Sequence, residues 1–319
     1  MPTGMRRFSV LLLAAALLGC SDGGGPTTAD APIAPESVVG EERALIDATR
    51  GTPVKQGFDG APDRTILTRL WYAPEAPRNA VCRRSGCALV VLAHGFGGST
   101  MRFDAYARSL ARLGYVVAAP TFPLTNEAAP GGHLSGLADL LSQPGDVSFV
   151  IDALADASND PSDPLHGRVD AGRVGLMGHS LGGATAIAAT RFDCCSDPRI
   201  DAVILVAAAD FVLPGLFGED VHADGPPTLS LTGDHDGVVP SAGVRAFHDG
   251  IEPPRVYVQL VGGNHVNLIE NYGEPSPLLM PTEDVSAAFF AAWLAGDGDS
   301  LEPTLETLSS EGNTVAADL

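Results

Sequence analysis

The sequence predicts an α/β protein with a mostly parallel central sheet and helices on both faces. Short apolar runs bounded by glycine, proline or charge alternate along the 319 residues with longer stretches of helical composition. This alternation is typical of βαβ units, whose crossover helices cover both faces of a parallel sheet. With 45% hydrophobic residues, the chain is long enough for one large core.

The expected elements follow in chain order. Strands are expected near residues 65–72, 88–93, 115–119, 173–178, 202–207, 227–232 and 255–260. Helices are expected near residues 99–113, 143–157, 181–191, 241–249 and 283–295. The link formed by residues 208–226 is too short to contain a separate domain above the sheet. We therefore expect no large cap domain.

Both ends of the chain differ from its centre. Residues 1–19 contain a basic pair, Arg6 and Arg7, followed by an apolar stretch, Phe8 to Leu18. This pattern is typical of a signal peptide, and the apolar stretch is too short for the roughly 20 residues of a membrane span. Residues 20–40, rich in Gly, Pro and small polar residues, are expected to form a flexible tether. The main domain is expected over residues 41–296. The acidic residues 297–319 contain few large apolar side chains, and we expect a loosely packed tail there.

The end of the apolar stretch indicates how the protein is exported. Leu17-Leu18-Gly19-Cys20 resembles the lipobox of bacterial lipoproteins, in which the signal is cut before the cysteine and the cysteine carries lipid. This interpretation predicts a lipoprotein of the outer membrane or cell surface, bound to the membrane only through its N-terminal anchor. The alternative is an ordinary secretory signal with an incidental Cys20, which predicts a periplasmic or secreted protein.

Charge and residue spacing exclude several classes of partner. Lys and Arg number 19 against 39 Asp and Glu, a net charge of -20, so electrostatic binding to nucleic acid or anionic lipid is not expected. No Cys and His spacing is typical of a zinc site, and the acidic residues 156–170 lack EF-hand spacing. We expect a monomer without metal or cofactor.

Four cysteines follow Cys20, and an even number in an exported protein favours disulfides. Cys82 and Cys87 flank a turn-like link, so a local bridge between them is the first interpretation. The adjacent Cys194 and Cys195 either form a vicinal bridge or bond elsewhere. Reduced buried thiols are the alternative.

A nucleophile motif stands at residues 178–182, which read Gly-His-Ser-Leu-Gly and are followed by Gly183. The motif follows the apolar residues 174–177 and precedes an Ala-rich stretch, which is the strand-turn-helix setting of the G-x-S-x-G nucleophile elbow. The turn strains the serine backbone and exposes its hydroxyl, and a Cβ in place of either flanking glycine would collide across the bend. Ser180 is therefore the candidate nucleophile.

The candidate base and acid follow downstream. An alcohol needs a base to attack a carbonyl at neutral pH, and His265 lies in a Gly-rich loop after the last expected strand. Asp236 is the candidate acid that orients His265, with Asp234 as its rival and Asp210 as a more distant alternative. Ser, acid and His in this order is the chain order of α/β-hydrolases.

An oxyanion needs two positioned N–H donors. One is expected from Leu181, directly after the nucleophile, and the other from Phe96 in the turn His-Gly-Phe-Gly-Gly at residues 94–98. The alternative for this turn is a tight strand-to-helix connection without a catalytic role.

These motifs together resemble those of secreted or lipid-anchored α/β-hydrolases of the dienelactone hydrolase, chlorophyllase and platelet-activating-factor acetylhydrolase type, which adjoin the bacterial cutinase-like polyester hydrolases. The resemblance runs from about Arg64 to Gly296. It rests on residues 70–74, 94–98, 143–150 and 164–170, the elbow, the Asp236 loop and His265. It implies the α/β-hydrolase fold and hydrolysis of a carboxylic ester by Ser180, Asp236 and His265 without a cofactor.

The chain departs from the cutinase-like pattern at the expected substrate site. Those enzymes usually carry Met after the nucleophile and Trp near the end of the next strand, where this chain has Leu181 and, roughly, Phe211. Polyester or lipase activity is therefore an alternative that the resemblance does not imply. We expect substrate contacts from Phe96, Leu181, Phe211 and Val238.

The fold and the triad leave other activities open. Peptidases, thioesterases and acyltransferases share this machinery, so neither the fold nor the triad excludes them. The non-enzymatic alternative is a lipid-anchored surface-binding protein that has kept the fold but lost catalysis.

Overall fold

The computed structural model describes residues 33–218, 221–269 and 276–319, and it contains a ten-stranded mixed sheet. The strands are β1 (Val39–Asp47), β2 (Arg64–Tyr72), β3 (Cys82–Arg83), β4 (Gly86–Ala93), β5 (Val116–Thr121), β6 (Val169–His179), β7 (Ile200–Val206), β8 (Thr228–Gly233), β9 (Arg255–Leu260) and β10 (Thr314–Asp318). The helices are α1 (Asp104–Arg112), α2 (Gln143–Asn159), α3 (Leu181–Arg191), α4 (Leu213–Phe217), α5 (Ser241–Gly250), α6 (Leu279–Phe290) and α7 (Leu301–Ser310).

The strand order β1-β2-β5-β4-β6-β7-β8-β9-β10 places the parallel strands at the centre of the sheet, and β3 pairs with β4 beside this path. Strands β5, β4, β6, β7, β8 and β9 run parallel to one another, whereas β1, β2 and β10 are antiparallel additions at the two edges. All eight residues of β4 are buried, as expected for a strand covered on both faces. The predicted fold class is confirmed.

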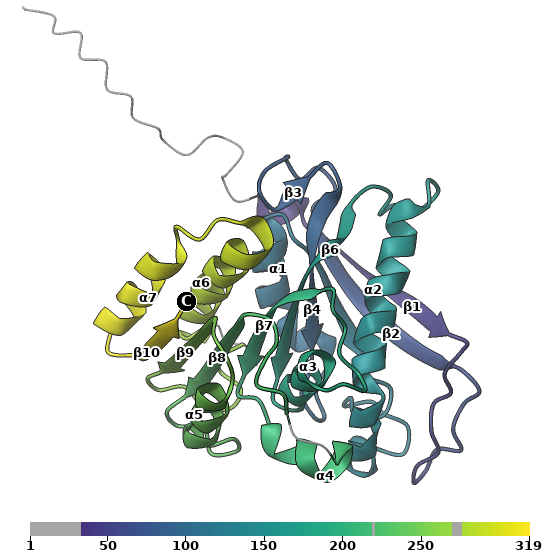
Figure 1. Ribbon diagram of the computed structural model, residues 1–319. Helices are drawn as coiled ribbons and strands as arrows, with labels where there is room; N and C mark the ends of the chain where they lie inside the picture. The colour runs from purple at the N-terminus through teal and green to yellow at the C-terminus, as the bar shows by residue number, and fades with distance from the viewer. Residues whose placement is uncertain (1–32, 219–220, 270–275) are drawn as a thin grey trace, which may run out of the picture.

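Helices cover both faces of the sheet (Figure 1). One apolar cluster joins the sheet to α1, α6 and α7, and a second joins its other face to α2, α3 and α4. Helix α6 continues into a π-helical turn, Ala291–Ala295, within the segment predicted as one helix. In the link formed by residues 208–226, the described part contains a short 3-10 helix (Asp210–Val212) and α4.

The prediction of a loosely packed tail at residues 297–319 is wrong. Leu301, Leu305 and Leu308 of α7 are buried in the core, and β10 pairs with β9 as an edge strand. The segment is acidic in composition, but its leucines recur at helical spacing and face one side of α7.

The expected tether also contains ordered backbone at its end, because β1 begins at Val39. Ile33 N–H donates to the Arg112 carbonyl at the end of α1, so the described chain begins against that helix. Cys20 and the predicted signal peptide lie outside the described residues. Within the described ranges, none of the helices combines the length and apolar character needed to cross a bilayer.

Disulfides are confirmed at both predicted pairs. Cys82 is bonded to Cys87, which faces it across the β3–β4 hairpin. Cys194 is bonded to its neighbour Cys195 in the turn after α3. The local and vicinal pairings are therefore the connectivity that the structure contains.

Candidate active site

Ser180 occupies a strained turn between β6 and α3. Its φ of 55° and ψ of -118° place a non-glycine residue in a region that L-amino acids rarely adopt. The backbone around it fixes this conformation, because Ser180 N–H donates to the Val206 carbonyl at 2.9 Å and the Ser180 carbonyl accepts from Ala209 N–H at 3.0 Å. The end of β7 thus holds the elbow in place.

The glycines of the elbow are required by close backbone approach. A Cβ on Gly178 would lie 2.1 Å from the Gly182 carbonyl oxygen, and one on Gly182 would lie 2.0 Å from the Ala93 carbonyl oxygen. Neither position can accept a larger residue without moving backbone. The absence of these Cβ atoms lets α3 begin directly against the end of β4.

Ser180, His265 and Asp236 form one hydrogen-bonded chain. His265 Nε2 lies 2.9 Å from Ser180 Oγ, and His265 Nδ1 lies 2.9 Å from Asp236 Oδ2. Because a carboxylate only accepts, Nδ1 carries the proton and Nε2 is free to accept from the serine hydroxyl. The Asp236 carboxylate is fully buried, whereas His265 is 15% exposed.

Asp236 is held by its own loop. Its Oδ1 accepts from the N–H groups of Val238 and Val239, both at 2.8 Å, which leaves Oδ2 to face His265. The rival Asp234 instead accepts from Gly262 N–H at 2.7 Å and contacts His235. Among the described residues, Asp236 is the carboxylate hydrogen-bonded to His265. Asp210 begins the 3-10 helix after β7, where burial raises its pKa.

His179 packs against His265, the candidate base. Its Nε2 donates to the His265 carbonyl at 2.6 Å, and the two rings lie 4.9 Å apart. Burial, together with the nearby His265, lowers the pKa of His179 to about 3, so this imidazole stays neutral. A neutral ring supports the His265 loop without placing a second positive charge beside the imidazolium.

The turn at residues 94–98 lies against the nucleophile. A Cβ on Gly95 would lie only 3.1 Å from Ser180 Cβ, which places the neighbouring Phe96 beside the site. Among the described residues, the N–H groups of Phe96 and Leu181 donate no hydrogen bond, so both are available to an oxyanion. The sequence predicts these two groups as oxyanion donors, and that role stays a prediction.

His94 fixes the base of this turn. Phe122 N–H donates to His94 Nε2 at 3.0 Å, so Nδ1 carries the proton and donates to the Gly95 carbonyl at 2.8 Å. Burial lowers the pKa of His94 to about 4, which keeps the ring neutral.

Exposed apolar side chains occur at the loops that carry the site. Phe96, Phe211 and Val238 are 37%, 64% and 62% exposed, whereas Leu181 is buried. His133 packs edge-on against Phe96 with ring centroids 5.0 Å apart. Lys55 Nζ donates to the carbonyl of Gly132, the residue before His133. No sequence pattern indicates that His133 lies beside Phe96, because the contact joins two loops that are distant in the chain.

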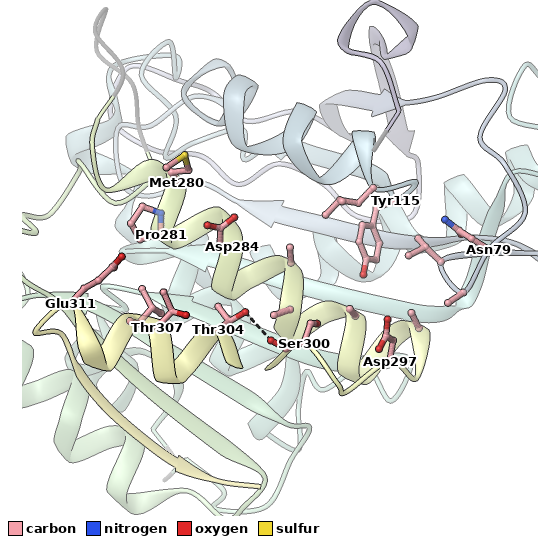
Figure 2. A pocket seen from close by; sticks show the side chains of 18 residues that line it. Asn79, Tyr115, Met280, Pro281, Asp284, Asp297, Ser300, Thr304, Thr307 and Glu311 are labelled. Carbon is pink, nitrogen blue, oxygen red and sulfur yellow. Dashed lines mark hydrogen bonds between the residues drawn. The ribbon is translucent and has the colours of Figure 1, made fainter. Parts of the chain in front are cut away.

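A separate groove of about 610 Å³ runs along α6 and α7 (Figure 2). Alanines of α6 line it together with Tyr115, Thr304 and Thr307, and Ser180, Asp236 and His265 do not line it. Within the described ranges, no group of three His, Cys, Asp or Glu side chains is placed to hold a metal ion. The geometry at Ser180 is suited to nucleophilic attack on a carbonyl by the protein's own side chains.

Comparisons with known proteins agree with this fold. The profile of the Alpha/beta hydrolase family matches residues 90–308. Bis(hydroxyethyl) terephthalate hydrolase of Streptomyces coelicolor is 28% identical over 189 residues, which are 54% of this chain and 56% of that protein. The match thus spans little more than half the length of this curated relative.

Among solved structures, ferulic acid esterase from Streptomyces cinnamoneus superimposes with a TM-score of 0.61 at 23% sequence identity. The superposition covers 84% of this chain and 93% of the esterase. At this identity, the likeness shows a shared fold.

Proposed function

The chain belongs to the α/β-hydrolase family, and from this premise we propose that it is a serine carboxylic-ester hydrolase that works through an acyl-enzyme. The observation that carries the proposal is the hydrogen-bonded chain from Ser180 Oγ through His265 to the buried Asp236. The strained elbow holds Ser180 at the start of this chain, so the nucleophile and its base need no rearrangement before attack.

The proposed reaction has two halves. Ser180 Oγ attacks the ester carbonyl carbon while His265 Nε2 takes the hydroxyl proton, and Asp236 stabilises the imidazolium that forms. The N–H groups of Phe96 and Leu181 bind the negatively charged oxygen of the tetrahedral intermediate. His265 then gives the proton to the leaving alcohol. In the second half, His265 activates a water that attacks the acyl-enzyme and releases the carboxylic acid.

The proposed substrates are esters with an apolar or aromatic part. The exposed side chains of Phe96, Phe211 and Val238 on the catalytic loops would contact such a group. The relative that acts on bis(hydroxyethyl) terephthalate supports an aromatic acyl group and keeps polyester hydrolysis as a second candidate. Membership of the dienelactone hydrolase, chlorophyllase and acetylhydrolase type is proposed only on the sequence motifs.

A panel of p-nitrophenyl, hydroxycinnamoyl and terephthaloyl esters, with a solid polyester included, tests the proposal. Ser180→Ala should lower the rate of ester hydrolysis by several orders of magnitude while keeping its fold, because it removes the nucleophile. A fluorophosphonate probe should label the unaltered protein and not this variant. A surface-binding protein without catalysis would neither label nor turn over any ester.

The proposed location is the cell envelope, with Cys20 as the lipidated residue. Several acyl chains on one cysteine give stable anchoring, whereas a single chain binds marginally. The full chain expressed in a bacterium should fractionate with membranes, and Cys20→Ser should release it or leave an uncleaved precursor. Unchanged membrane fractionation with normal signal removal would favour plain export.

A further inference from the structure

Gln143 lies fully buried at the start of α2 and joins two segments of the candidate site. Its Nε2 donates to Thr125 Oγ1 at 2.8 Å, and its Oε1 accepts from Thr185 Oγ1 at 2.5 Å. Thr125 and Thr185 are also buried, with exposures of 1% and 0%. One side-chain amide therefore connects the segment after β5 to helix α3, without access for solvent.

The first end of this bridge supports the Phe96 turn. The Thr125 carbonyl accepts from Gly97 N–H at 2.7 Å, directly after Phe96. Gly98 also pairs with Asn126 in an isolated parallel β-bridge, so the backbone after β5 contacts the Phe96 turn at more than one residue. A movement of Thr125 would be transmitted to the Phe96 N–H group.

The second end supports the Leu181 N–H group. Thr185 lies one helical turn after Leu181, and its single hydroxyl hydrogen is shared between Gln143 Oε1 at 2.5 Å, the main acceptor, and the Leu181 carbonyl at 3.2 Å. The hydroxyl of Thr185 thus links the first turn of α3 to Gln143. One proposed oxyanion donor lies in the Phe96 turn and the other at the start of α3, and Gln143 is hydrogen-bonded to one residue that supports each of them.

Gln143 is itself held firmly. Asp146, on the next turn of α2, accepts from Arg64 Nε at 2.6 Å and from Arg64 Nη2 at 2.5 Å. Both side chains are fully buried, so this pair fixes the first turn of α2 to β2. The position of the bridge is therefore set by the sheet.

We infer that Gln143 is a positioning residue that sets the distance between the Phe96 and Leu181 N–H groups of the oxyanion hole. It does not touch the substrate and acts through Thr125 and Thr185. The inference rests on the proposed ester hydrolysis. Donors in an oxyanion hole act only when they are aimed at the developing charge, so loss of the bridge affects the transition state more than the bound substrate.

Gln143→Met tests this role, because methionine has a similar length and makes neither hydrogen bond. We expect kcat to fall about tenfold, which is less than the 10²- to 10³-fold lost with a whole oxyanion donor, and KM to change less than about twofold. An arylboronic acid forms a tetrahedral adduct with the serine and places an oxygen in the hole. Its inhibition constant should rise by about the same factor as kcat falls.

Ser158→Ala is the matched control. Ser158 lies near the other end of α2 and also makes two buried hydrogen bonds, both with Val169 at 3.0 Å. This variant should lower the melting temperature without changing kcat or boronate binding. If Gln143→Met behaves in the same way, Gln143 is merely structural and the inference is overturned.

Thr125→Val gives an independent test that keeps the side-chain shape and the backbone carbonyl. It should reproduce the loss in kcat, and the double variant with Gln143→Met should be no worse than either alone, because both break the same bridge. Additive losses would contradict a single bridge. Ser180→Ala distinguishes failure of the proposed function from failure of this inference. Full ester turnover in that variant would refute Ser180 as the nucleophile, whatever the effect of Gln143→Met.

Discussion

Asp236→Asn should inactivate the enzyme by imposing the wrong tautomer on His265. The N–H groups of Val238 and Val239 both point at Oδ1, each at 2.8 Å, so the asparagine oxygen must occupy that place. Its NH₂ group then faces His265 Nδ1, where the carboxylate now accepts. Nδ1 would have to accept, the proton would move to Nε2, and no base would remain for Ser180.

The size of the effect follows from these two backbone donors. The productive tautomer requires the amide to flip, which costs two buried hydrogen bonds at about 1–3 kcal/mol each. A cost of about 2–6 kcal/mol lowers the population of the flipped form by about 30-fold to about 10⁴-fold, since each 1.4 kcal/mol is a factor of ten. Loss of the carboxylate charge also weakens the imidazolium. We expect kcat to fall by about 10³- to 10⁴-fold.

Steady-state hydrolysis of a p-nitrophenyl ester measures the effect, with melting temperature as the check on folding. Asp234→Asn is the control, because its retained oxygen can still accept from Gly262 N–H, and its kcat should stay within about threefold of the unaltered enzyme. The reasoning is refuted if Asp236→Asn loses less than about tenfold in kcat, or if Asp234→Asn is the more impaired variant.

Two further predictions concern stability. Leu305→Ala should lower the free energy of unfolding by about 2–5 kcal/mol with kcat unchanged, because Leu305 is buried in the core and remote from Ser180. Denaturant titration measures this free energy. A decrease of less than about 1 kcal/mol would contradict the packing of α7. Burial lowers the pKa values of His94 and His248 to about 4 from 6.5. The unfolded chain alone binds these protons below about pH 6.5, so the free energy of unfolding should be highest above that pH and fall towards pH 4 by up to about 1.4 kcal/mol per pH unit for each histidine. Denaturant titrations at several pH values between 4 and 6.5 should show that the free energy of unfolding changes less steeply with pH in His248→Phe than in the unaltered protein. An equal slope in the two proteins would contradict the lowered pKa of His248.

The sequence predicted the parallel strands because each has a strong local signal. Strands β4 to β9 are apolar runs that end in glycine, proline or polar residues, and they were expected within a few residues of their observed bounds. The edge strands lack that signal. β1 alternates charged and apolar residues with partial exposure, and β10 is short and has mostly small side chains. Each forms a strand because it pairs with its neighbour rather than because of its composition.

The sequence does contain a signal for helix α7. Leu301, Leu305 and Leu308 recur at i, i+4 and i+7, although the residues around them have the acidic composition typical of a loose tail. The bridge through Gln143 is different in kind. Thr125, Gln143 and Thr185 come from three separate segments, and no periodicity in one segment indicates that its polar side chain is buried against another.

The two carboxylates of the loop after β8, Asp234 and Asp236, have different hydrogen-bond partners. Asp236 orients the imidazole, whereas Asp234 binds Gly262 N–H and so fixes the start of the loop that carries His265. The two loops touch through glycine, since a Cβ on Gly233 would lie 2.2 Å from the Gly263 backbone. The glycines that precede the acid and the base in the sequence therefore serve one contact between backbones. That contact places His265 beside Asp236, and the geometry of the proposed triad depends on it as much as on the side chains themselves.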